Sequence, residues 1–166
     1  MRAVKPDLKG FIKLGVFLVF LISLLCIVFK LTYNYITPAS PEQVWDTLVS
    51  LGYEPYDSTA TYIKQDSTLI RSVTIQKDDL RFDFFMFDNK GSAANVFSKA
   101  LSNIQGKYRA SPMVEGEWYS ANNYKYSLKA SGVYSIAMYV SSTAIYAYCD
   151  AENQEKVDAI FATIGY

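Results

Sequence analysis

The feature that most constrains the fold is an apolar run without a charged residue, which extends from Leu14 to Phe29. A helix needs about 20 apolar residues to cross the hydrocarbon core of a bilayer. The run approaches that length if Lys13 and Lys30 extend their ammonium groups towards the two membrane interfaces. The sequence therefore predicts a transmembrane helix over residues 11–33, preceded by a short tail over residues 1–10.

Positive charge is concentrated before this run, where Arg2, Lys5, Lys9 and Lys13 lie, whereas Lys30 alone follows it closely. Flanks rich in lysine and arginine stay on the cytoplasmic side of a membrane. We therefore expect a cytoplasmic N-terminus and an extracellular C-terminal domain. The predicted location is the cell membrane, with the lipid bilayer as one partner.

Two cleavage hypotheses compete with an uncleaved anchor. A signal peptide needs small residues soon after its apolar core, but the best candidate, Thr37-Pro38-Ala39, lies well past Phe29 and contains a proline. A lipoprotein needs a small residue before its acylated cysteine, and here Leu25 precedes Cys26. The sequence thus favours an uncleaved helix without excluding cleavage.

A third hypothesis comes from Lys9-Gly10-Phe11 and the apolar segment after it, which resemble the processing site of type IV pilins. That resemblance implies an apolar helix ahead of an α+β head. The chain departs from the pattern because Gly15 stands where those proteins have a glutamate. Pro38 and Pro41 also interrupt the region where the pilin helix continues.

The remaining chain reads as a linker over residues 34–40 and one domain over residues 41–166. Its helical and strand periodicities alternate in the order helix, two strands, helix, three strands, helix. Strands are expected at 69–77, 80–88, 123–130, 133–140 and 143–149, and helices from a Ser40 cap to Gly52, over 92–104, and from Asp150 to Ile164. The predicted fold class is α+β: an N-terminal transmembrane helix followed by a two-layer sandwich of an antiparallel sheet with helices mainly on one face.

Composition argues against several functions. The chain has no histidine, which removes the commonest general base and metal ligand. Residues 38 to 166 carry 11 Lys or Arg and 15 Asp or Glu, so they lack the positive surface that nucleic-acid binding requires. Cys26 and Cys149 lie too far apart in the predicted architecture to form a disulfide.

The carboxylates lie in a turn, an alternating strand and a polar loop, and we expect them to be solvated surface charges: Asp78, Asp79, Asp83, Asp88, Glu115 and Glu117. No catalytic residue, metal ligand or cofactor site can be assigned. The sequence therefore predicts that the chain is not an enzyme.

Aromatic residues are unusually abundant, with 14 Tyr and 10 Phe. Strand alternation directs Phe82, Phe84 and Met86 into the core. The other face of the sheet then carries Phe85, Phe87, Tyr139, Tyr146 and Tyr148. If helices cover only one face, these five residues form an exposed patch, which is typical of a recognition site. Serine in place of Tyr146 and Tyr148 would then abolish binding at little cost in stability.

The helix ending in Leu-Gly-Tyr, the Phe-Asp-Phe-Phe strand, the Ala-Ala helix and the C-terminal Gly-Tyr resemble small extracytoplasmic proteins of low-GC Gram-positive bacteria. That resemblance implies no activity. We expect a membrane-anchored binding or interaction module whose partner is an envelope protein or a cell-wall glycan. The alternative is a structural subunit of an envelope machine such as a secretion, conjugation or pilus-like apparatus.

Overall fold

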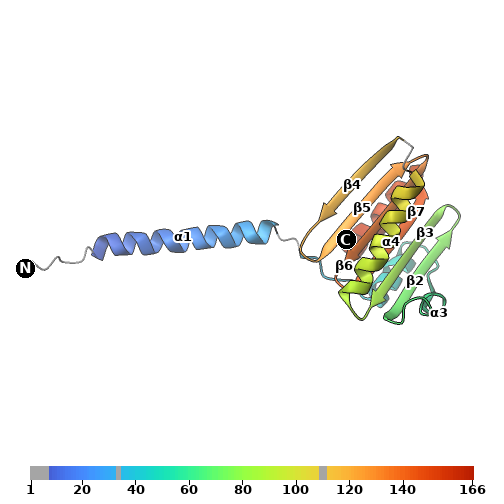
Figure 1. Cartoon of the computed structure of the whole chain (residues 1–166), viewed down its shortest axis with the longest axis horizontal. Coiled ribbons are helices and arrows are strands. Elements are labelled where there is room, and N and C mark those ends of the chain that lie inside the picture. Colours follow the sequence, from blue (N-terminus) through green and yellow to red (C-terminus); the bar gives the residue numbers. More distant parts are fainter. Residues whose placement is uncertain (1–7, 33–34, 109–111) are drawn as a thin grey trace, which may run out of the picture. The chain divides into compact units, whose positions relative to one another are not determined.

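The computed structural model describes residues 8–32, 35–108 and 112–166. The chain divides into two compact units, Met1–Asn34 and Tyr35–Tyr166, and Figure 1 shows the elements of each. Residues 1–7 of the predicted tail lie outside the described residues. The first unit contains one helix, α1 (Leu8–Thr32).

The prediction of a transmembrane helix is wrong. Among the described residues, no helix combines the length and the apolar character that crossing a membrane requires. Helix α1 includes Lys9, Lys13 and Lys30, so its uncharged run falls short of the roughly 20 apolar residues of a span. The prediction had counted the flanking lysines as part of that span. The large apolar side chains described in α1, from Val16 to Phe29, are exposed.

The second unit is built on a seven-stranded antiparallel sheet with the order β1-β2-β3-β7-β6-β5-β4. Two predicted hairpins, β2–β3 and β6–β7, are confirmed. Two strands were not predicted, the short β1 and the edge strand β4. The strands are β1 (Tyr56–Asp57), β2 (Leu69–Lys77), β3 (Leu80–Phe87), β4 (Met113–Tyr119), β5 (Asn123–Ala130), β6 (Val133–Val140) and β7 (Thr143–Asp150).

One face of the sheet packs against α2 (Pro41–Ser50) and α5 (Gln154–Ile164), the latter preceded by a 3₁₀ turn, η1 (Ala151–Asn153). The predicted inward residues Phe82 and Phe84 are fully buried in this cluster with apolar side chains of both helices. The edge of the Phe82 ring packs on Phe161 of α5, with ring centroids 6.1 Å apart. This face is the larger part of the core.

The opposite face is also covered, by the long helix α4 (Lys90–Tyr108) and the short helix α3 (Thr59–Tyr62). Figure 1 shows α4 lying across the sheet. Phe97 and Ile104 of α4 are buried with Tyr126 and Leu128 of β5. The prediction of two layers with helices mainly on one face is therefore wrong, and the unit has three layers, α/β/α. An apolar stripe on a helix can be buried on either face of a sheet. The stripe of α4 therefore shows that the helix is packed, but it does not show which face of the sheet the helix covers.

Local sequence explains where the helices of this unit begin and end. The Ser40 hydroxyl accepts a hydrogen bond from the backbone N–H of Gln43 at 3.1 Å, as the predicted cap requires. Gly52 and Gly165 adopt φ values of +82° and +93°. Only glycine adopts this left-handed conformation without strain, so both residues end their helices. Asp150 occupies the N-cap position of η1, as predicted for the start of the last helix, but its side chain makes no capping bond, and α5 itself begins after Asn153.

Candidate functional site

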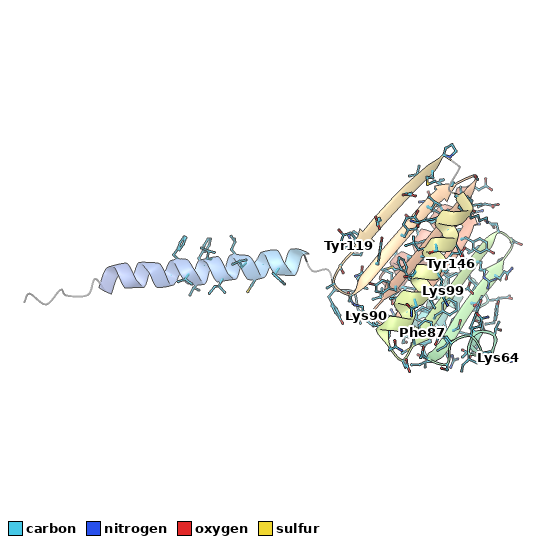
Figure 2. The ribbon with its side chains drawn as sticks, viewed as in Figure 1. Lys64, Phe87, Lys90, Lys99, Tyr119 and Tyr146 are labelled. Carbon is cyan, nitrogen blue, oxygen red and sulfur yellow. The ribbon has the colours of Figure 1, made fainter. Side chains whose placement is uncertain are left out.

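A recess opens on the second face of the sheet, between α3 and α4. It consists of two adjoining cavities of about 350 and 190 Å³, whose linings share Tyr62, Phe85, Val96 and Lys99. Strands β3 and β7 form the floor, and the two helices form the walls. Lys99 of α4 and Tyr146 of β7, both labelled in Figure 2, line the larger cavity together. The larger cavity lies within the size range of small-molecule sites, about 300–1,000 Å³.

The polar part of the floor is an ion pair on β3. The Nε of Arg81 donates a hydrogen bond to Oδ2 of Asp83 at 2.7 Å, and its Nη2 donates to Oδ1 at 3.3 Å. Asp83 is 3% exposed, so the expectation of a solvated carboxylate is wrong here. The carboxylate tolerates burial because a guanidinium neutralises it at hydrogen-bond distance.

Hydroxyl groups from the neighbouring strand complete the surroundings of Asp83. Oγ1 of Thr74 donates to Oδ1 of Asp83 at 2.8 Å. Oγ of Ser58 lies 2.7 Å from that of Thr74 and 2.8 Å from that of Ser72. All four residues are buried. A satisfied buried network of this kind fixes side-chain positions, so the floor beneath the recess is preorganised.

Tyr62 of α3 forms one wall. The edge of its ring packs on Phe85, with centroids 5.1 Å apart and planes 82° apart. Its hydroxyl oxygen accepts a hydrogen bond from Nη2 of Arg81 at 2.8 Å. The helix is positioned by Asp57, whose Oδ1 accepts from the backbone N–H of Thr59 at 2.9 Å. Tyr62 therefore connects the wall to the floor.

The other wall is one side of α4. Val96, Lys99, Ala100 and Asn103 line the larger cavity, and their spacing places them on one helical face. Val96 and Ala100 are half-buried, whereas Lys99 and Asn103 are exposed at the rim. Within the described part of the chain, neither polar side chain of the rim makes a hydrogen bond.

The five residues predicted to bind a partner all lie on this second face, but the expected open patch is wrong. Phe85 and Phe87 are 9% and 2% exposed, in a cluster with Ala93 of α4. Tyr139 packs against Phe97 of α4, with ring centroids 5.4 Å apart. Tyr146 and Tyr148 are half-buried. Helix α4, which was predicted to lie on the other face of the sheet, covers most of the patch.

What remains of the patch faces the recess. Phe85, Tyr146 and Tyr148 line the larger cavity, and Phe87 lines the smaller one. The rings of Tyr146 and Tyr148 lie 5.8 Å apart. The structure thus brings four of the five predicted residues to one site and leaves Tyr139 beneath α4.

Burial and hydrogen bonding shift the pKa of several groups in the recess, among them Tyr62, Arg81 and Tyr146. Burial, followed by the nearby Tyr148, Tyr108 and Asp83, raises the pKa of Tyr146 above its usual value. Burial also raises the pKa of Tyr62, and the hydrogen bond to Asp83 raises the pKa of Arg81. Tyr62 and Tyr146 therefore remain uncharged hydroxyl groups at neutral pH, and Arg81 remains a cation.

Neither a metal-ligand cluster nor the buried thiol belongs to the described lining of this recess. The described residues include no cluster of three or more His, Cys, Asp or Glu side chains that could hold a metal ion. Cys149 lies in the opposite core, where burial raises the pKa of its thiol to about 11.

Sequence patterning missed Tyr62, Arg81, Lys99 and Asn103 as members of the site. One signal was present, because Arg81 and Asp83 share a strand face with Phe85 and Phe87. Two charges on the same side as two buried aromatics indicate a polar network inside the fold. Comparison with protein-family models, with curated proteins and with solved structures finds no match to this chain.

Proposed function

We propose that the unit Tyr35–Tyr166 is a binding module whose recess holds an uncharged, hydroxyl-rich ring ligand, such as one or two sugars of a cell-wall glycan. The observation that carries the proposal is the aromatic recess itself, which offers hydrogen-bonding groups that the fold does not use. Tyr146, Tyr148, Lys99 and Asn103 line it, and none makes a hydrogen bond to the described residues.

Aromatic walls suit a ligand with flat apolar surfaces and polar edges. Tyrosine presents both an apolar ring and a hydroxyl group, and it loses little conformational entropy on binding. A sugar ring has the matching combination of C–H faces and hydroxyl edges. Tyr62, Tyr146 and Tyr148 could therefore contact its faces, while the rim groups of α4 contact its edges.

The charges around the recess favour an uncharged ligand. Arg81 and Lys99 contribute two positive charges, and Asp66 and Asp83 contribute two negative charges. Arg81 is already paired with Asp83. A phosphate-rich ligand would require several uncompensated cations, so this balance argues against nucleic acid.

Titration of the full-length chain with soluble oligomers of N-acetylglucosamine, followed by NMR, tests the proposal. We expect chemical-shift changes in the recess residues of β3, β7 and α4. The variant Tyr148→Ser should weaken binding by about tenfold, because aromatic anchors dominate binding energy.

Tyr119→Ser is the matched control, because Tyr119 is a tyrosine on β4 that is 74% exposed and outside the recess lining. Its binding should equal that of the wild type. Absence of binding by the wild type, or an equal loss in both variants, would refute a glycan site in the recess. The extracytoplasmic location and the alternative role in an envelope machine stay predictions.

A further inference from the structure

The two edges of the sheet differ in how they are protected. At one edge, β1 has only two residues, and α3 packs against the neighbouring β2. At the other edge, all seven residues of β4 are exposed. An edge strand carries backbone N–H and C=O groups without a strand partner, and proteins usually shorten or cover such edges. Strand β4 is therefore the long, accessible edge of this sheet.

The side chains of β4 differ between its two faces. Register with β5 places Glu115 opposite Leu128 and Glu117 opposite Tyr126, so both glutamates lie on the α4 side. Val114 and Trp118 lie on the other side and are 72% and 42% exposed. Oε1 of Glu115 accepts a hydrogen bond from the Tyr126 hydroxyl at 2.9 Å, but within the described residues neither glutamate forms an ion pair. The edge thus offers two carboxylates on one face and an apolar pair on the other.

A second copy of this chain is a poor match for that edge. In a symmetric dimer, two antiparallel β4 strands can pair with the two-fold axis at Glu115, Gly116 or Glu117. In each of these registers the glutamate sides of both strands lie on the same face of the joined sheet. Each of these registers sets one glutamate opposite another, either the same residue or its neighbour two positions away. Like charges directly opposite one another destabilise a strand pair. The glutamates therefore disfavour self-association through β4.

We propose that β4 is a docking edge for an extended segment of a different protein, in which basic side chains alternate with apolar ones. Such a segment would add an eighth strand, with its backbone bonded to β4. Its lysine or arginine side chains would lie beside Glu115 and Glu117, and its apolar side chains beside Val114 and Trp118. The proposal is independent of the recess, because no β4 residue lines either cavity.

The test uses the full-length chain and a short synthetic peptide in which lysine and valine alternate. Amide hydrogen exchange measured by NMR should show that the peptide slows exchange along β4 by about tenfold or more. A peptide that alternates glutamate and valine is the matched control and should leave β4 unprotected. The variant Glu115→Gln/Glu117→Gln should weaken binding of the lysine peptide, and Glu117→Lys should allow binding of the glutamate peptide.

Three results would overturn the proposal. Equal protection by both peptides would show that charge does not select the partner, and protection by neither would show that the edge does not accept a strand. A concentration-dependent dimer that protects β4 without peptide would make a second copy the occupant. Protection by the lysine peptide alone, reversed by Glu117→Lys, would establish the edge as a site for basic segments.

Discussion

Asp83 accepts a hydrogen bond from Nε of Arg81 at 2.7 Å, although only 4% of the Asp83 side-chain surface is exposed. The same guanidinium donates to the Tyr62 hydroxyl of α3, and the same carboxylate accepts from Thr74 of β2. One ion pair thus connects the interior strand β3 to the adjacent strand β2 and to a wall of the recess. Its removal should affect stability and the shape of the site together.

We predict that Asp83→Asn lowers the free energy of unfolding by about 2–3 kcal/mol, because it leaves a partly buried cation without its counter-charge. The value lies at the low end for buried pairs because the Arg81 side chain is 29% exposed. Urea unfolding followed by circular dichroism measures the loss.

Asp57→Asn is the control for this prediction. The Arg71–Asp57 ion pair has a length of 3.2 Å, and its two side chains are 46% and 45% exposed. Exposed pairs contribute about 0–1 kcal/mol, so this variant should unfold almost like the wild type. Equal losses in the two variants would contradict the special role of Asp83.

The structure changes the expectation for Tyr146. An exposed tyrosine could become serine at little cost, but Tyr146 is half-buried and packs against Tyr148 and the cluster beneath α4. We predict that Tyr146→Ser costs about 1–2 kcal/mol of unfolding free energy and that Tyr146→Phe costs less than half of that, because it keeps the ring. Thermal unfolding of both variants provides the measurement. If Tyr146→Ser were as stable as the wild type, the Tyr146 ring would not be part of the core.

Much of the second unit could be predicted because its local patterns agree with its packing. Alternation in β3 assigned Phe82 and Phe84 to the correct core, and Ser40 and Gly52 marked the ends of α2. Strand β4 was missed because its pattern, MVEGEWY, lies in an edge strand exposed on both faces. With no buried face, such a strand has no need for a hydrophobic period.

The site was predicted only in part, for a physical reason. Alternation identifies which residues share a strand face, and it grouped Phe85, Phe87, Tyr146 and Tyr148 correctly. It does not determine which helix covers that face, so the burial of Phe85 and Phe87 was missed. Tyr62 and Lys99 come from other elements, and only the crossing of α4 over the sheet brings them to the recess.

We predict that Phe97→Ala lowers the free energy of unfolding by about 3–4 kcal/mol, as expected for a buried aromatic side chain. Phe97 is 3% exposed, and its ring contacts those of Tyr124 and Tyr139 at centroid distances of 4.7 and 5.4 Å. Hydrogen exchange should accelerate in α4 more than in α2, because the substitution removes the largest of the buried contacts that Phe97, Ile104 and Ala93 make between α4 and the sheet.

Val49→Ala in α2 serves as the comparison, since Val49 is 53% exposed and exposed substitutions usually change stability by less than about 0.5 kcal/mol. A small effect of Phe97→Ala, similar to that of Val49→Ala, would argue against α4 as a packed third layer.

The last prediction concerns alkaline pH and the Tyr134 hydroxyl, which donates a hydrogen bond to Oδ1 of Asp158 at 3.0 Å. Burial, and then this bond to a carboxylate, raises the pKa of Tyr134 well above its ordinary value of about 10. In the unfolded chain the hydroxyl ionises near that ordinary value, whereas in the folded chain it keeps its proton to higher pH. The folded state therefore binds more protons, and stability falls as the pH rises above about 10.

Comparison of the wild type with Tyr134→Phe isolates this effect. Near pH 8 the variant should be less stable by about 1 kcal/mol, because Asp158 loses a hydrogen bond. The difference should shrink as the pH rises from about 9 to 11, since only the wild type loses this contribution. Lys125 titrates nearby with a pKa lowered by burial, so it opposes the trend, but it is common to both proteins and cancels in the difference. Urea unfolding across this range gives the comparison, and a difference that stays constant with pH would show that the Tyr134–Asp158 contact does not shift the ionisation of the hydroxyl.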